Sequence, residues 1–255
     1  MKDAPAVRRL ARSPAAFCAV MVVFFVALLG LDHFADRRDQ VVLGLVTWCV
    51  LLAACRPLPA ERRAQVVLVI GAATCMEVLG SLIWGVYEYR LGNLPPCVPP
   101  AHGLVYLTGV RLSETRLASR HARIFVASVL AGACLWTVAG LTVLPRLDVA
   151  GMIGALTFAS FVLFGRAPAI YCGVFVAVAG LELYGTAIGT WRWAEAIPGL
   201  GLPDGNPPSG AASGYVLFDV VALALAPSLL RIVRAVAQWE PALWLRRASA
   251  RGDAA

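Results

Sequence analysis

Long apolar stretches, separated by short segments that carry most of the charge, constrain this chain more than any other feature. The sequence has 255 residues, of which 60% are hydrophobic and 15% are charged, and its mean hydropathy is +0.75. Soluble domains carry about 25% charged residues. One bilayer crossing needs about 20 apolar residues, so the chain has room for seven or eight crossings and for no separate soluble domain. We therefore expect an all-α, polytopic membrane helix bundle.

The apolar runs predict about eight transmembrane helices. One of these runs contains Arg111, and it spans the bilayer only if the long arginine side chain reaches the membrane interface. The approximate limits are 15–31, 41–55, 65–87, 101–114, 124–144, 149–165, 168–190 and 213–231.

The distribution of arginine and lysine predicts the topology. With eight helices and a cytoplasmic N-terminus, 17 of the 22 basic residues fall in cytoplasmic segments and 5 in outer ones. Without the fourth helix the split becomes 9 and 13. Because cytoplasmic loops are enriched in basic residues, we predict eight spans in the cell membrane with both termini cytoplasmic. The net charge of +7 then reflects topology, and we expect no nucleic-acid partner.

The chain begins with a basic segment that resembles the start of a signal peptide. No small-residue cleavage site follows the first apolar run, so we expect an uncleaved first helix. The expected organisation is a basic cytoplasmic N-terminus, a first four-helix repeat, a basic cytoplasmic linker, a second four-helix repeat and a basic cytoplasmic tail. These units cover 1–14, 15–114, 115–123, 124–231 and 232–255.

The two four-helix units are expected because one pattern occurs twice. Each copy has a glutamate in an apolar run, a glycine three residues later, a second glycine, an aromatic pair and a Pro-Pro outer loop. The first copy holds Glu77, Gly80, Gly85, Tyr87 and Tyr89, and the second holds Glu182, Gly185, Gly189, Trp191 and Trp193. Four spans per copy predicts a parallel tandem duplication. Shared composition of two membrane helices is the alternative explanation.

Three acids lie inside apolar runs, where a carboxylate is costly and needs partners. Glu77, Glu182 and Asp219 are predicted near mid-membrane or slightly outward. One interpretation places them in a single catalytic site that opens toward the outer face, with His102 and Tyr106 at its border. In the other, neutral acids bond across the repeat or to Thr74, Ser81, Thr186 or Thr190, and so hold helices together.

The aromatic pairs have two interpretations as well. Tyr87, Tyr89, Trp191 and Trp193 lie where two predicted helices leave the membrane. Interfacial tyrosine and tryptophan belts explain such positions. The same four side chains are also candidate substrate-binding residues, because they follow the two glutamates.

No motif for a cofactor or a metal is present. The sequence lacks a Walker loop, HExxH, GxSxG and a dinucleotide fingerprint. The seven cysteines form no CxxC pair, and most lie in apolar runs, where cysteine behaves as a small hydrophobic residue. We therefore expect no metal site and chemistry without a cofactor.

The segment 76–106, MEVLGSLIWGVYEYRLGNLPPCVPPAHGLVY, resembles part of the membrane carotenoid-biosynthesis proteins of the bisanhydrobacterioruberin-hydratase type. The similarity rests on Glu77, Gly80, Gly85, Tyr87 and Tyr89. It implies protonation and hydration of a polyene end without a cofactor, with Glu77 as the acid. The second copy departs from the pattern, since tryptophans replace the tyrosines.

Three functions therefore stay open. The first is a membrane enzyme that modifies an apolar lipid, such as an isoprenoid, by acid–base chemistry. The second is a proton-coupled small-solute transporter, which would use midplane acids in parallel repeats. The third is an accessory subunit whose acids are structural. The expected partners are the lipid bilayer, an apolar lipid substrate, and another membrane protein or a second copy of the chain.

Overall fold

The computed structural model describes residues 13–252, with side chains through residue 237. Helices dominate, and four short strands lie in two connecting segments. The helices are α2 (Pro14–Phe34), α3 (Arg37–Cys55), α4 (Ala60–Glu77), the π-helical η1 (Val78–Trp84), α5 (Val98–Ser113), α6 (Arg116–Arg120), α7 (Ala122–Thr142), α8 (Val149–Phe164), α9 (Pro168–Ala187), α10 (Ser209–Gly214) and α11 (Val216–Gly252). The strands are β1 (Tyr87–Tyr89), β2 (Trp191–Trp193), β3 (Ala196–Ile197) and β4 (Leu202–Pro203).

Six helical segments in the described part are long and apolar enough to cross a membrane. They cover Pro14–Phe34, Arg37–Cys55, Ala60–Trp84, Ala122–Thr142, Pro168–Ala187 and Ser209–Ala237. Large hydrophobic side chains are widely exposed on them, for example Val23 at 70% and Leu135 at 70%. Lipid, rather than water, is the solvent that tolerates such a surface. The chain is therefore a multi-pass membrane protein.

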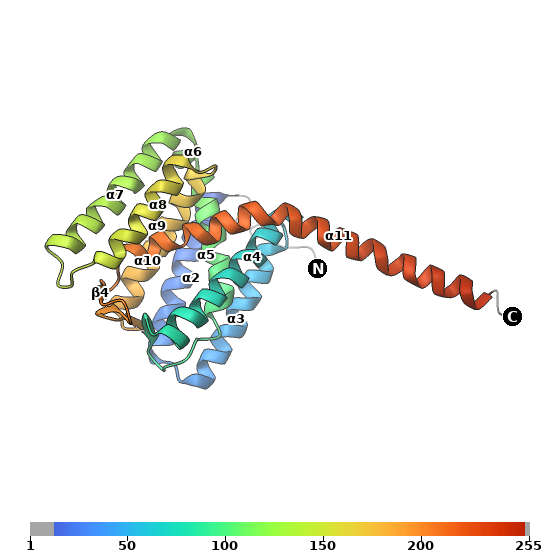
Figure 1. Ribbon diagram of the computed structural model, residues 1–255, viewed down its shortest axis with the longest axis horizontal. Helices are drawn as coiled ribbons and strands as arrows, with labels where there is room; N and C mark the ends of the chain where they lie inside the picture. The colour runs from blue at the N-terminus through green and yellow to red at the C-terminus, as the bar shows by residue number, and fades with distance from the viewer. Residues whose placement is uncertain (1–12, 253–255) are drawn as a thin grey trace.

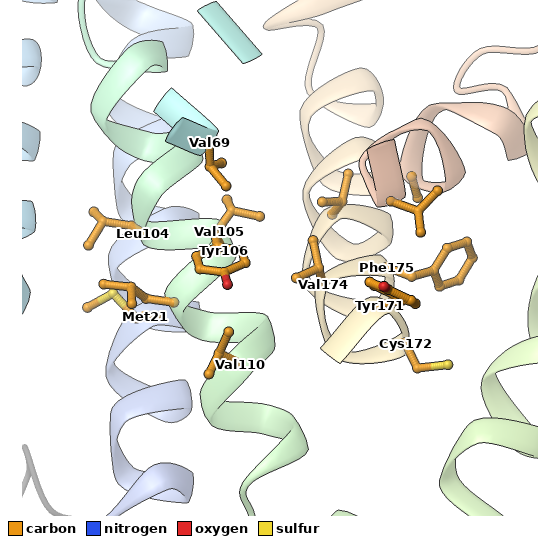
Figure 2. Packing of buried hydrophobic residues seen from close by; sticks show 14 of the residues in the cluster. Met21, Val69, Leu104, Val105, Tyr106, Val110, Tyr171, Cys172, Val174 and Phe175 are labelled. Carbon is orange, nitrogen blue, oxygen red and sulfur yellow. The ribbon is translucent and has the colours of Figure 1, made fainter. Parts of the chain in front are cut away.

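The helices form two groups that meet along α5 and α9. Figure 1 shows α7, α8 and α9 on one side, α2, α3, α4 and α5 on the other, and α11 crossing the bundle obliquely before it projects beyond it. Side chains of α5 and α9 face each other in the core, among them Val105 and Val174 (Figure 2). The helices approach closely at Gly109 and Gly173, where a Cβ on either residue would meet the other helix's backbone. Small residues at crossings allow such close approach in membrane helices.

Helix ends follow local sequence signals. Asp36 caps α3 in a capping box with Asp39, and Asp148 caps α8 by accepting from the Gly151 amide. Gly85 ends η1 with a φ of 75°, in the left-handed region that favours glycine. These capping residues determine where each helix ends and the chain turns back.

A small sheet closes one end of the bundle. Strand β1 pairs with β2 in antiparallel register, with Tyr87 opposite Trp193 and Tyr89 opposite Trp191. Strands that far apart in the sequence bring the two halves of the chain together. The sheet was not expected, because these residues were predicted to be helix ends. The alternation in Tyr-Glu-Tyr and Trp-Arg-Trp is a period-two signal that could have indicated strands.

Each apolar run identified in the sequence forms a helix, although the ends of the helices differ from the predicted ones. Two of these helices, α5 and α8, have 16 residues each and are shorter than the six apolar segments described above. Eight spans therefore stay a prediction. The expected N-terminal segment falls almost entirely on residues 1–12, outside the described part. The expected tail at 232–255 begins within α11, which continues to Gly252.

Candidate functional site

A cavity of about 940 Å³ lies between the two groups of helices, beneath the β1–β2 sheet. Glu77 and Glu182 both line it, as does His102. Tyr87, Tyr89, Trp191 and Trp193 contribute to its wall, and most of the other lining side chains are apolar. The structure thus brings two of the three predicted acids and all four predicted aromatic residues to one place.

Glu77 accepts hydrogen bonds from two phenols. Its Oε2 lies 2.6 Å from the Tyr87 hydroxyl and 2.8 Å from the Tyr89 hydroxyl. Alternate residues of a strand point to the same face, so both rings reach the carboxylate. Burial and the nearby Glu77 carboxylate raise the pKa of Tyr87 and Tyr89 above the ordinary phenol value. The two hydroxyls therefore stay protonated and keep donating.

The other oxygen of Glu77 contacts a histidine. Oε1 lies 3.2 Å from Nε2 of His102, at a distance that suits an ion pair, although the N–H direction is not aligned for a good hydrogen bond. The second ring nitrogen, Nδ1, lies 3.1 Å from the Tyr215 hydroxyl. Tyr215, His102 and Glu77 thus form a contiguous row of groups that can carry exchangeable protons.

Glu182 accepts hydrogen bonds from two indoles. Its Oε2 lies 3.0 Å from Nε1 of Trp191 and 3.1 Å from Nε1 of Trp193. Glu182 is buried, with 8% of its surface exposed, and it interacts electrostatically with Glu77. The two indole N–H donors thus orient the Glu182 carboxylate.

Two glycines make room for the sheet. A Cβ on Gly80 would lie 3.0 Å from the Tyr87 ring, and a Cβ on Gly185 would collide with the Trp191 indole. Aromatic rings also contact each other across the strands, with ring centres of Tyr87 and Trp193 4.7 Å apart. The glycine three residues after each glutamate is therefore required by the aromatic residue that bonds that glutamate.

The predicted hydroxyl partners of the glutamates are not the ones observed. Ser81 and Thr186 donate to the backbone carbonyls of Glu77 and Glu182, four residues earlier, and not to the carboxylates. Membrane helices often satisfy serine and threonine in this way. Sequence reasoning gave the aromatic residues two interpretations, interfacial and substrate-binding, and missed that they bond the acids.

Asp219 and Tyr106 lie apart from the cavity. Neither is among its lining residues. The Tyr106 hydroxyl donates to Gln65 at 2.9 Å, and Asp219 acts electrostatically on Tyr106. Asp219 is 1% exposed, and its Oδ2 has no hydrogen-bond partner in the described part of the chain. The structure therefore does not bring the third acid together with Glu77 and Glu182.

Tyr215 is a site residue that sequence reasoning did not single out. It lies between α10 and α11, lines the cavity and contacts His102. No spacing signal linked it to a residue 113 positions earlier, so only the fold could have found it.

The site offers acid–base groups and no metal-binding cluster. Within residues 13–237, no three His, Cys, Asp or Glu side chains are placed to hold a metal ion. Among the described residues that line the cavity there is no lysine or arginine. Comparisons with protein-family models, with curated proteins and with solved structures give no match for this chain.

Proposed function

We propose that the protein is a membrane enzyme that modifies a lipid of the isoprenoid type by acid–base chemistry, without a cofactor. One observation carries the proposal: the Tyr215–His102–Glu77 chain faces a large cavity with a mainly apolar wall. Cavities of this size bury most of a drug-sized ligand, and a few polar groups then fix its orientation. The apolar wall suits a hydrocarbon chain, and the polar chain suits proton transfer.

The chemistry proposed is addition of water across a carbon–carbon double bond. Glu77, protonated through His102, gives its proton to one alkene carbon, and the electron pair of the double bond forms the new C–H bond. The resulting carbocation lies against aromatic rings, whose faces stabilise cations by about 0.5–2 kcal/mol each. Water then adds to the cation, and the carboxylate takes back the proton that the water loses. Atoms and charge balance with water as the only co-reactant.

A tandem duplication of four spans is part of the proposal. The glutamates, the glycines beside them, the left-handed glycines Gly85 and Gly189 and the paired strands occur in the same order in both halves. Helix α5 packs on α9 and α11 packs on α4, which is the exchange that a pseudo-twofold axis would produce. With α5 and α8 counted as spans, the chain would cross the membrane eight times with both termini cytoplasmic.

A proton-coupled transporter is the second candidate, and one observation favours it. The helix changes from α to π geometry directly after Glu77, at η1. Departures from α geometry beside a buried acid occur at transporter sites, and π segments are frequent at functional sites generally. A transporter would need the cavity to open alternately to the two aqueous sides.

Glu77→Gln, with Glu88→Gln as the matched control, tests the proposal. Glu88 lies on the same strand, but its side chain is exposed and faces away from Tyr87 and Tyr89. Lipid extracts of producing cells would be compared by mass spectrometry, and folding would be checked by thermal unfolding in detergent. We expect the hydrated lipid to be replaced, only in the Glu77 variant, by a species that is lighter by the mass of one water molecule.

Unchanged lipids in a folded Glu77→Gln variant would contradict the enzyme proposal. Proton uptake by proteoliposomes would then be measured for the same two variants. Uptake that Glu77→Gln abolishes and Glu88→Gln leaves intact would favour the transporter.

A further inference from the structure

The mouth of the cavity is entirely apolar. Among the described lining residues, those that are exposed are all hydrophobic and belong to only two segments, α4–η1 and α11. They are Met76, Leu79, Ile83, Trp84, Leu217 and Val221. Ile83 is 70% exposed, Leu79 47% and Leu217 46%. Side chains of this kind face hydrocarbon, so the cavity opens through the side of the bundle.

The end of the cavity near the sheet is closed by polar and aromatic contacts. Strands β1 and β2 lie over it and are tied to Glu77 and Glu182 from below. Arg146 donates to the Trp193 carbonyl at 2.9 Å, and Trp84 donates to the Pro198 carbonyl at 2.9 Å. These bonds hold the connecting segments in place as a cover.

The two helices that frame the mouth touch each other further along. Helices α4 and α11 are in contact, and Ala73, Ala222 and Ala226 are buried on them. Small buried residues let helices approach closely. Beyond Glu77, helix α4 continues as the wider π-helical η1, whose Leu79 and Ile83 are exposed. Helices α4 and α11 therefore pack together at the alanines, and η1 and α11 leave the cavity open between them.

The lining also restricts the chemistry of what can enter. Its described residues include no lysine or arginine, and they include two glutamates that interact electrostatically with each other. A phosphate group would lose its water without gaining a cation, and it would lie near carboxylates. A neutral chain pays neither penalty.

We propose that the gap between η1 and α11 is a lateral portal, through which a neutral, long-chain lipid without a phosphate group enters the cavity from the bilayer. This inference rests on the proposed function, because it takes the cavity to be a lipid site. Beyond that function, the inference specifies the route by which the lipid enters and predicts that phosphorylated lipids are excluded. The reacting end of the chain passes η1 and reaches the Glu77–His102 pair.

Photo-crosslinking in liposomes tests the portal. The probes are a diazirine-bearing long-chain alcohol and its phosphate monoester, and crosslinked peptides are mapped by mass spectrometry. We expect the alcohol to label the peptide around Val98, Ala101 and Val105, which line the cavity, and the phosphate to label it far less.

Bulk placed at the mouth should slow labelling. Leu79→Trp with Leu217→Trp should reduce the labelling rate of the alcohol several-fold, and Leu79→Ala with Ile83→Ala should increase it. Leu135→Trp on α7 is the matched control, because Leu135 is 70% exposed and lies outside the cavity lining. Thermal unfolding verifies that each variant is folded.

The outcomes separate the portal from the function. Cavity labelling that is equally fast in folded tryptophan variants overturns the portal and leaves the lipid site standing. Equal labelling by alcohol and phosphate overturns the exclusion of phosphorylated lipids. If neither probe labels the cavity of the unsubstituted protein, the proposed function fails together with the portal.

Discussion

The sites around Glu77 and Glu182 line one cavity, but their hydrogen-bond donors differ. Two phenols donate to Glu77, and two indoles donate to Glu182. A phenol hydroxyl can both donate and accept, whereas an indole N–H can only donate. Glu77 also contacts His102.

The difference teaches how one architecture can serve two roles. Around Glu77, protons can move along the hydroxyl, imidazole and carboxylate groups. Around Glu182, the donors fix the carboxylate and have no proton to exchange at ordinary pH. We therefore expect Glu77 to be the acid of the reaction and Glu182 to position the sheet and tune the field across the cavity.

Exchanging each glutamate for glutamine gives the largest expected contrast. Glu77→Gln removes the acid and should lower product formation by ~10²–10⁴-fold, the usual contribution of a general acid. Glu182→Gln keeps a polar group between the indoles and should cost less than ~10-fold. Lipid extracts quantified against protein content measure both. An equal loss in the two variants would break the proposed division of roles.

Adding a methyl group at the two glycines tests the shape of the two sites. Gly185→Ala should destabilise the protein by ~1–3 kcal/mol, the usual cost of overpacking, because the Trp191 ring occupies that space. Gly80→Ala should cost less, because its Cβ would lie 3.0 Å from a Tyr87 ring that can shift slightly. Thermal unfolding in detergent measures the difference. A more damaging Gly80→Ala would contradict this comparison.

Removing one hydrogen bond from Glu77 tests the contribution of its phenol donors. Tyr87→Phe deletes a hydroxyl 2.6 Å from Glu77 and keeps the ring, so we expect a loss of ~1–3 kcal/mol in stability, typical of a bond to a charged group. Tyr184→Phe on α9 is the control, because its hydroxyl only approaches the Val26 carbonyl at 3.5 Å. Equal unfolding temperatures for the two variants would indicate that the phenol does not stabilise Glu77.

The smallest expected contrast is between two aspartates in connecting segments, Asp204 and Asp36, and concerns the pH dependence of stability. Burial, followed by the charge of Asp148, raises the pKa of Asp204 to about 7, against about 3.9 in an unfolded chain. The folded state then binds the proton more tightly, so this group's contribution to stability is full below about pH 4 and is lost as the pH rises through about 7. Asp204→Asn should therefore raise the unfolding temperature relative to the unsubstituted protein increasingly toward alkaline pH.

A matched substitution exists in the first half. Asp36 caps α3 by accepting from the amides of Arg38 and Asp39, and it is not a buried residue. Asp36→Asn should preserve the cap, since asparagine caps helices about as well as aspartate. Its effect on the unfolding temperature should therefore be small. A pH-independent difference for Asp204→Asn would show that the Asp204 carboxyl is not protonated in the fold.

Much of the fold follows from local sequence signals. Hydropathy alone placed the long apolar helices, because a run of apolar residues near bilayer length has few other stable forms. Capping residues such as Asp36 and left-handed glycines such as Gly85 mark their ends. The sequence also indicated Glu77, Glu182 and His102 as site residues, since an ionisable group in an apolar run needs a partner.

Tertiary structure decided which partners those residues received. The two aromatic pairs, predicted to be interfacial or substrate-binding residues, fold into strands that pair although they lie about 100 residues apart in the sequence, and they bond the two glutamates. Tyr215 reaches His102 because α11 crosses the bundle, and Asp219 is buried but does not line the cavity. The periodicity of apolar residues indicates whether a given residue faces an apolar or a polar environment. Contacts between distant segments depend on how helices cross, which no local pattern contains.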